Sequence, residues 1–219
     1  MKSFLVLFLI LAAFIFVQGQ DRYEKAMMKN LSKMDSSNKV EDYLQIANGF
    51  ERIAQAEKDK WLPYYYSSWV YTIASFSDTT KSKKDGYLDK ADNFISMADS
   101  LEPNNSEIYT LKGMIAQARM QVDPMNRWMK YGAESDQDFK KAVAIDSLNP
   151  RPDYLIGVGI YYTPQQFGGG PKNAKPYLEK SLEKFNQFKP ENDIAPNWGR
   201  RMVEGLLSQI AESDTTGVK

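Results

Sequence analysis

Pairs of small residues recur along this chain at a nearly fixed period, and no other feature constrains its fold as strongly. The members of each pair lie seven residues apart, and successive pairs are separated by 44, 44 and 39 residues. The pairs are Ala47 with Ala54, Ala91 with Ala98, Ser135 with Ala142, and Ala174 with Ser181. Because Ala and Ser let a neighbouring helix backbone approach closely, a repeat of this length is typical of stacked helical hairpins. The pattern therefore predicts an all-α fold.

Apolar periodicity and turn residues divide the rest of the chain into helices and loops. We expect helices over residues 23–34, 40–58, 62–76, 87–101, 106–121, 135–145, 152–162, 174–185 and 202–210, the last of them capping the array. A polar loop is expected over residues 77–85 and an insertion over residues 122–131. The organisation that follows is a single helical repeat domain over residues 20–212 and a flexible tail over residues 213–219.

The N-terminus predicts export. An unbroken apolar run of 14 residues, Phe4 to Val17, follows Lys2, and Val17-Gln18-Gly19 supplies the short residues that signal peptidase reads. A membrane-spanning helix needs about 20 apolar residues, so a retained anchor is the weaker interpretation. We therefore expect a secretory signal peptide over residues 1–19, cleavage near Gly19, a periplasmic or secreted protein, and no stable membrane insertion after cleavage.

Composition narrows the possible functions. The chain has no Cys and no His, and its formal net charge is zero. Without Cys there are no disulfides, so packing alone must hold the fold. The zero net charge does not favour nucleic-acid binding. The absence of His does not favour catalysis, because His is the commonest general base near neutral pH. We expect no enzymatic activity, no cofactor and no metal. Glu134, Asp136 and Asp138 are interpreted as a helix start, and Gly168 to Gly170, followed by Pro171, as a tight turn.

The repeat pattern resembles the tetratricopeptide repeat (TPR). Small residues stand at the expected place in first helices, at Gly113, Gly157 and Ser68, and bulky apolar residues in second helices, at Ile95, Phe139 and Leu178. The first unit departs from the pattern with Glu51, and the observed periods exceed the family's 34 residues. The resemblance implies a right-handed superhelix of antiparallel hairpins that serves as a protein-interaction scaffold. The segment from Asn149 to Trp198 also looks like exported bacterial repeat proteins of unassigned function.

Aromatic residues form the candidate binding site. The TPR register implies that Tyr65 and Trp69 of one repeat, and Tyr154, Tyr161 and Tyr162 of another, face a concave groove, although core packing explains the same residues. Trp128, in the insertion, is a further candidate. Our first hypothesis is a scaffold that binds a protein or peptide partner through this face. The alternative is an envelope protein that binds a carbohydrate or another small ligand with the same aromatic residues.

Overall fold

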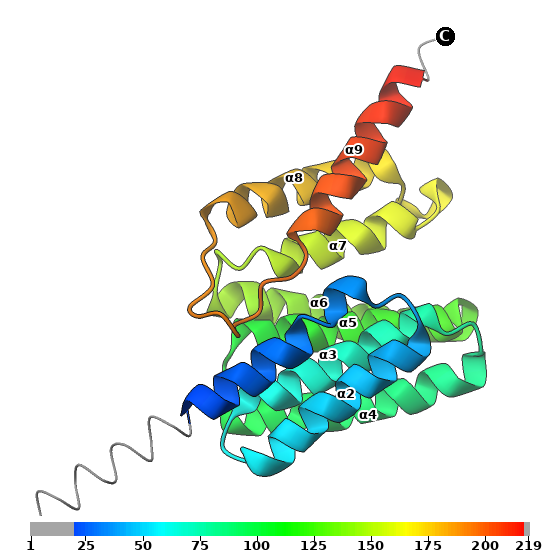
Figure 1. The fold of residues 1–219 in the computed structure, drawn as a ribbon. Coiled ribbons are helices and arrows are strands. Elements are labelled where there is room, and N and C mark those ends of the chain that lie inside the picture. The colour runs from blue at the N-terminus through cyan, green and yellow to red at the C-terminus, as the bar shows by residue number, and fades with distance from the viewer. Residues whose placement is uncertain (1–19, 217–219) are drawn as a thin grey trace, which may run out of the picture.

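The computed structural model describes residues 20–216, and all regular structure in that range is helical (Figure 1). Residues 20–31 form the first helix. The following elements are η1 (Met34–Ser36), α2 (Val40–Ala56), α3 (Trp61–Ser77), α4 (Lys81–Leu101), α5 (Ser106–Val122), α6 (Pro124–Ile145), α7 (Arg151–Tyr162), η2 (Gln165–Phe167), α8 (Pro171–Gln187) and α9 (Arg200–Thr216). The predicted signal peptide, residues 1–19, lies outside the described residues. The all-α prediction is confirmed.

Successive helices pack against each other as hairpins, and the recurring small residues lie where they cross. Helices α3 and α4, α5 and α6, and α7 and α8 form the most extensive of these contacts, together with α2 and α3. Every member of the small-residue pairs is buried, as predicted. Hydroxyl groups bond across the crossings: Ser68 Oγ donates to the carbonyl of Ala91, and Ser106 Oγ donates to that of Ala142. The small residues thus permit both close packing and hydrogen bonds between helices.

Two glycines mark close approaches inside the later hairpins. A Cβ at Gly113 would lie 2.4 Å from Cε1 of Phe139, and one at Gly157 would lie 2.8 Å from Cδ2 of Leu178. Each glycine therefore accommodates a bulky side chain from the second helix of its own hairpin.

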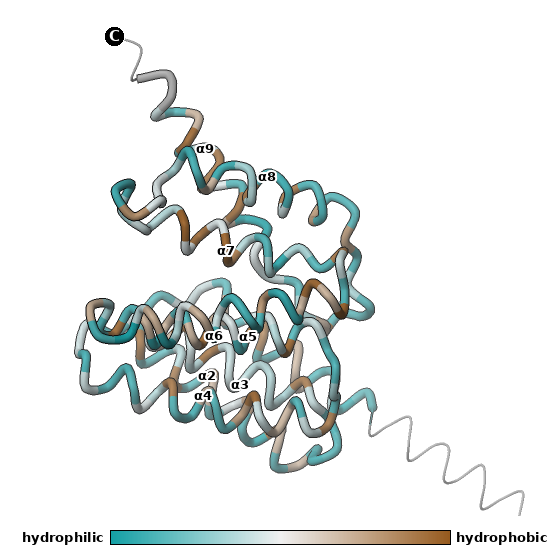
Figure 2. Tube along the Cα trace, turned by 180° about the vertical axis from the view of Figure 1, so that it is seen from behind, coloured by the Kyte–Doolittle hydropathy of each residue, from teal (hydrophilic) through white to brown (hydrophobic). Residues whose placement is uncertain are grey.

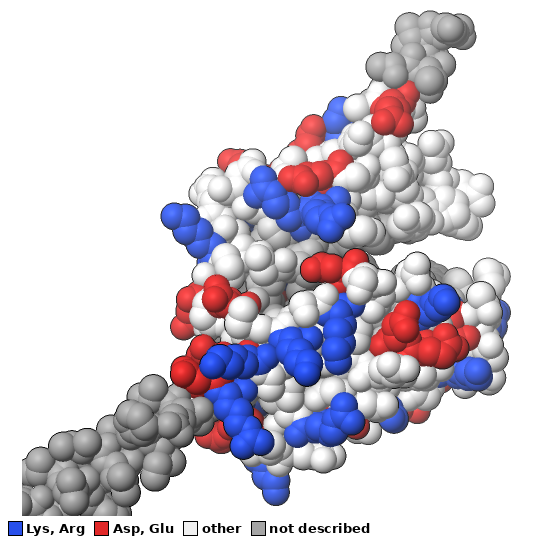
Figure 3. Space-filling view, in the orientation of Figure 1, with Lys and Arg blue, Asp and Glu red and all other residues white. Residues whose placement is uncertain are grey.

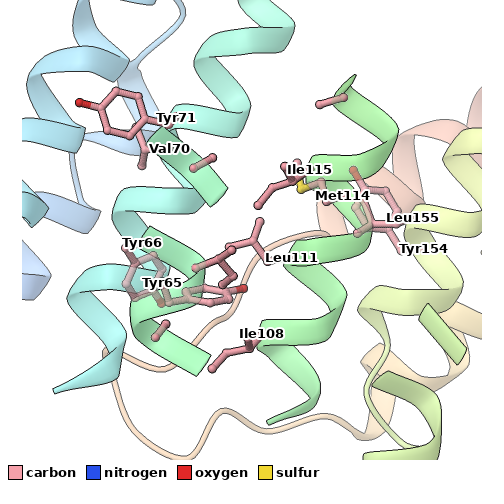
Figure 4. Close-up of a cluster of buried hydrophobic side chains, with 14 of the residues drawn as sticks. Tyr65, Tyr66, Val70, Tyr71, Ile108, Leu111, Met114, Ile115, Tyr154 and Leu155 are labelled. Atoms are coloured by element: carbon pink, nitrogen blue, oxygen red, sulfur yellow. The ribbon is translucent and has the colours of Figure 1, made fainter. Parts of the chain in front are cut away.

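One hydrophobic core runs through the array. In Figure 4, Tyr65 and Tyr66 of α3, Leu111 and Met114 of α5, and Leu155 of α7 belong to one cluster of buried side chains. Figure 2 shows the remaining polar residues distributed over the outer surfaces of the hairpins. None of the helices in the described part of the chain is both long and apolar enough to span a bilayer.

Two connections differ from the sequence predictions. Helix α4 begins at Lys81, so the expected loop over residues 77–85 is mostly helical. Only Asp123 separates α5 from α6, and the predicted insertion over residues 122–131 mainly extends α6 at its N-terminus. Pro124 is favourable in a first turn, and both terminal nitrogens of Arg127 bond the carboxylate of Asp85 on α4, at 2.6 and 2.8 Å. This bidentate pair ties the extension to the preceding hairpin.

The glycine-rich segment before α8 is a turn, as predicted. Gly168 and Gly170 have φ angles of +82° and +97°, a region that residues with a Cβ rarely occupy. Gly169 lies against Thr163, whose carbonyl oxygen would be 2.0 Å from an added Cβ. The three glycines are therefore explained by backbone geometry. At the other end, α9 continues to Thr216, so the segment predicted to be a flexible tail begins as helix.

Substituting glycines by alanine tests the packing of the hairpins. Gly113→Ala should lower the free energy of unfolding by about 1 to 3 kcal/mol, because the new methyl group overlaps the Phe139 ring. Gly132→Ala, in α6 with no atom within 4 Å of the added Cβ, should raise it by about 0.5 to 1 kcal/mol through helix propensity. Urea unfolding measures both. Effects of the same sign would contradict the assigned packing.

Candidate functional site

A hollow separates α7 from the helices that precede it. Figure 1 places α7, α8 and α9 on one side and the earlier helices on the other, and Figure 3 shows the surface between them deeply indented. Both walls of the indentation are largely free of Lys, Arg, Asp and Glu side chains in that view. The hollow is therefore an opening with few charged side chains in a molecule whose remaining surface carries many charges.

Aromatic rings from three separate segments meet where α7 faces α3 and the segment before α9. Trp69 of α3 stacks on Trp198, which lies between α8 and α9, with ring centroids 5.6 Å apart and an interplanar angle of 21°. Tyr154 of α7 meets the same Trp198 ring edge-on at 6.2 Å. Trp69 and Trp198 are half-buried, so part of each ring is accessible. These three residues, with Tyr161, are called the aromatic cleft below.

Tyr161 extends the aromatic cleft along α7 towards its open end. It is seven residues, or about 10 Å of helix, beyond Tyr154. Its hydroxyl donates to Oε1 of Gln209 on α9 at 3.2 Å, and its ring meets that of Tyr162 edge-on at 5.0 Å. Val158 lies between Tyr154 and Tyr161 on the same helical face and is half-buried. The α7 wall thus alternates ring and aliphatic surface.

The predicted site residues are divided by burial. Trp69 and Tyr161 are half-buried, and Tyr162 is 69% exposed. Tyr154 is 8% exposed and contributes mainly its contact with Trp198. Tyr65 is fully buried, so its assignment to the groove surface is corrected: the carboxylate of Glu107 and the indole of Trp198 cover it.

Trp128 occupies a different environment. It is 60% exposed on the N-terminal extension of α6 and is flanked by Met125 and Met129, which are 85% and 70% exposed. None of the ring contacts found in the described residues joins Trp128 to the aromatic cleft. The structure therefore brings Trp69, Tyr154 and Tyr161 near one another and leaves Trp128 on a separate exposed stripe.

A buried polar network, called the Glu107 network below, holds the inner end of the cleft. Trp198 Nε1 donates to the Tyr65 hydroxyl at 2.9 Å, and that hydroxyl donates to Oε2 of Glu107 at 3.4 Å. Arg151 Nη1 and Asn149 Nδ2 donate to the other carboxylate oxygen at 2.7 and 2.9 Å. These bonds connect α3, α5, the start of α7 and the segment before α9, which together determine where Trp198 lies.

Arg151 is the most deeply buried member of this network. Its side chain is fully buried, its Nη2 donates to the carbonyl of Pro196, and its guanidinium lies 4.7 Å from the Phe188 ring centroid and 5.4 Å from that of Trp198. Burial raises the pKa of the Glu107 carboxyl, and the positive charge of Arg151 opposes that increase. Removing one partner of such a pair leaves the other charge buried and uncompensated.

Sequence reasoning did not identify Trp198, Glu107 or Arg151 as site residues. Trp198 lies in an irregular segment, where helical periodicity gives no information. In the sequence, Pro196-Asn-Trp-Gly marks only a break between helices. The structure shows that Gly199 has a φ of +108° and that an added Cβ there would lie 3.0 Å from Phe185 and 3.3 Å from Tyr154. A glycine at such a close approach indicates that the neighbouring Trp198 is held tightly against the core.

A second hollow, of polar character, lies between α4, α5 and α6. This cavity of about 490 Å³ is lined by Asp92 and Ser96 of α4, Lys112 and Arg119 of α5, and Lys130, Tyr131, Glu134 and Asp138 of α6, among others. Arg119 Nη2 bonds Asp89 and Asp92 at 2.7 and 2.6 Å, so much of this charge is paired. No set of acidic residues in the described range is arranged to hold a metal ion.

The acidic group on α6 does not start a helix, which corrects the sequence interpretation. Because α6 begins at Pro124, Glu134, Asp136 and Asp138 lie in its middle. Burial raises the pKa of Asp138 to about 6, with Lys112 opposing the shift and Glu134 adding to it.

Asp138 should make stability depend on pH. Since its pKa is higher in the folded protein than the ordinary value of about 4, the folded state binds this proton more tightly than the unfolded chain does. That stabilisation is present below pH 4 and is lost as the pH rises through about 6. Asp138→Asn should therefore melt at a higher temperature than the parent at pH 8, and the difference should shrink towards pH 4. Equal differences at both pH values would contradict the burial of this carboxyl.

The Glu107 network should respond to the loss of a single hydroxyl. Tyr65→Phe leaves the buried Trp198 Nε1 without its acceptor, which should lower the free energy of unfolding by about 1 to 3 kcal/mol. Tyr161→Phe, whose hydroxyl bond to Gln209 is exposed and can be replaced by water, should change it by less than about 0.5 kcal/mol. Urea unfolding monitored by tryptophan fluorescence compares the two, and equal losses would show that the network is not a structural support.

Comparison with known proteins identifies a relative among the solved structures. No protein-family model matches the chain, and no curated protein matches it. Among solved structures, it is similar to the HusA haemophore from Porphyromonas gingivalis, with 34% sequence identity and a TM-score of 0.77. The alignment covers 87% of this chain and 94% of HusA. At this identity and coverage the likeness extends beyond the fold, and the chain belongs to the same protein family as the HusA haemophore.

Proposed function

We propose that this protein binds haem, and that the aromatic cleft holds the flat face of the ligand. The observation that carries the proposal is the meeting of Trp69, Tyr154 and Trp198 where α7 faces α3 and the segment before α9, in a relative of a haemophore. It replaces the peptide-binding hypothesis as our first choice and develops the small-ligand alternative.

The shape and chemistry of the cleft suit a large planar ligand. Indole and phenol rings offer broad apolar contact at little cost in side-chain entropy, and they stack on other π systems at centroid distances of about 4.5 to 7 Å. The accessible parts of the Trp69 and Trp198 rings form one such platform, and Val158 and Tyr161 continue the apolar wall along α7. A porphyrin would replace water on all of these surfaces at once.

Iron ligation is restricted by composition. The sequence contains neither His nor Cys, which are frequent protein ligands of haem iron. Among the side chains placed at the cleft, Tyr161 and Tyr162 carry phenol oxygens of the kind that ligate ferric haem in some proteins. The apolar walls must therefore supply a large part of the binding free energy in this proposal.

The proposal also includes the architecture and the location of the protein. We infer that the hairpins form a TPR-like right-handed superhelix, which is supported by the contacts of α3 with α5 and of α5 with α7. We further propose that residues 1–19 are a cleaved signal peptide, that the protein acts outside the cytoplasm, and that it is a carrier with no enzymatic activity. A haemophore as relative is consistent with export.

A second candidate function, binding of a protein partner, is supported by the exposed stripe on α6. Met125, Trp128 and Met129 lie at helical spacing on one face, and each is more than half exposed. Such a face suits an apolar protein contact. A photo-reactive residue at position 128 should cross-link a discrete protein in intact cells, whereas one at position 109 should not. Equal labelling at both positions would remove the support for this second function.

Haem titration tests the first proposal. Trp69→Ala removes the ring that stacks on Trp198 and should weaken haem binding by about thirtyfold or more, corresponding to about 2 kcal/mol. Tyr161→Ala, at the outer part of the same wall, should weaken it by about tenfold. The Soret absorbance of haem measures the affinity, and thermal unfolding shows whether each variant is folded at the assay temperature.

The matched control is Tyr109→Ala. Tyr109 is also half-buried, but it contacts Lys112 and Lys141 between α5 and α6, away from the cleft. Its replacement should leave the haem affinity within about twofold of the parent. If a folded Trp69→Ala protein binds haem as the parent does, the aromatic cleft is not the site.

A further inference from the structure

The first helix and the turn that follows it carry a row of basic side chains, Arg22, Lys25 and Lys29 on the helix and Lys33 in the turn. Arg22, Lys25, Lys29 and Lys33 follow one another at intervals of three and four residues, and all four are exposed. Figure 3 shows Lys and Arg side chains gathered over this part of the molecule, where Figure 1 places residues 20–31. These four residues are called the basic stripe.

The basic stripe lies opposite the buried face of its helix. Tyr23 and Met27 pack into the core, and the buried Asn30 donates through Nδ2 to the carbonyl of Ile46 on α2 at 2.8 Å. These contacts fix the rotation of the helix about its axis. The three charges on the helix are therefore held along one line on a rigid element.

The stripe forms no direct ion pair in the described part of the chain, and its four positive charges outnumber the two carboxylates of the same helix, Asp21 and Glu24. Among the described residues, Arg22, Lys25 and Lys29 take part in none of the ion pairs, and Lys33 bonds only the neutral side chain of Asn30, at 3.4 Å. Arg119, Arg127 and Arg151 elsewhere are paired with carboxylates. The whole chain has no net charge. The excess of basic residues on this face therefore results from where the charged residues lie, and not from a surplus of Lys and Arg in the sequence.

We propose that the basic stripe is a docking surface for an anionic lipid bilayer. Charge complementarity with lipid phosphates supports this occupant, because Lys and Arg near a negatively charged membrane surface are attracted to it. An acidic protein partner fits less well: protein interfaces are enriched in Arg and aromatic anchors and depleted in Lys, whereas three of these four residues are Lys and no exposed aromatic residue lies among them. A fluid anionic surface needs no such anchor.

The proposal does not depend on the ligand of the cleft. The stripe follows the outer face of the first helix, whereas the aromatic cleft is built from α3, α7 and the segment before α9. Docking through the stripe would hold a carrier at a membrane while its cleft stays formed. Failure of haem binding would leave this inference standing, and failure of vesicle binding would leave the haem proposal standing.

Vesicle co-sedimentation tests the inference with the soluble protein recovered from expressing cells. At low salt, it should bind phosphatidylcholine vesicles containing phosphatidylglycerol at least tenfold more tightly than vesicles of phosphatidylcholine alone, and added salt should weaken the binding. The double variant Lys25→Glu with Lys29→Glu should lose at least tenfold of this affinity. The control, Lys140→Glu with Lys172→Glu, makes the same change of net charge at exposed residues of α6 and α8 and should bind like the parent.

Three results would overturn the proposal. The first is absence of binding by the parent to anionic vesicles, with thermal unfolding confirming that the protein is folded. The second is an equal loss in the stripe and control variants, which would show that net charge alone matters. The third is retention of stripe-dependent binding to soluble polyglutamate with no binding to vesicles, which would identify an acidic polypeptide as the partner class.

Discussion

The buried pair of Glu107 and Arg151 is the interaction on which the arrangement of the helices most depends. It joins the first turn of α5 to the first residue of α7, at the point where the two parts of the molecule meet. Both side chains are screened from water, so breaking the pair from one side would cost about 3 to 5 kcal/mol. The hydrophobic core alone would allow α7 a range of tilts over α5, whereas this pair and its hydrogen bonds select one of them.

The same pair determines the geometry of the cleft. Arg151 holds the Pro196 carbonyl, and Glu107 holds the Tyr65 hydroxyl that accepts a hydrogen bond from Trp198. Trp198 belongs to a segment without regular structure, and its ring position is set by these polar contacts and by stacking on Trp69. A residue outside regular structure is thus held by contacts to α3, and in the proposed haem site this would reduce the ordering cost of binding.

The sequence predicted the parts of this fold that depend on local periodicity. The small-residue pairs follow from helix periodicity, so their burial could be predicted before the structure was known, whereas the fit of Gly113 against Phe139 is seen only in the structure. Tyr65 was wrongly placed on the groove because it lies one turn before Trp69 on the same face, and only the tertiary structure shows that Glu107 and Trp198 cover it. The role of Trp198 could not be predicted, since it arises from contacts between residues more than 100 positions apart.

Charged residues have two different positions in this chain of zero net charge: some pair between helices, and others face solvent. Most of the arginines near the core are paired with carboxylates across helices, as with Arg127 and Asp85, and these pairs position helices. The cleft walls carry few charges, so a ligand that enters them exchanges water for ring and aliphatic contact. On the first helix, Arg22, Lys25 and Lys29 are exposed and take part in none of the ion pairs found in the described residues. Charged residues that make no structural contact remain available to bind an external partner. Because these residues follow one another along a helix, we propose that they match an extended anionic surface better than a single small anion.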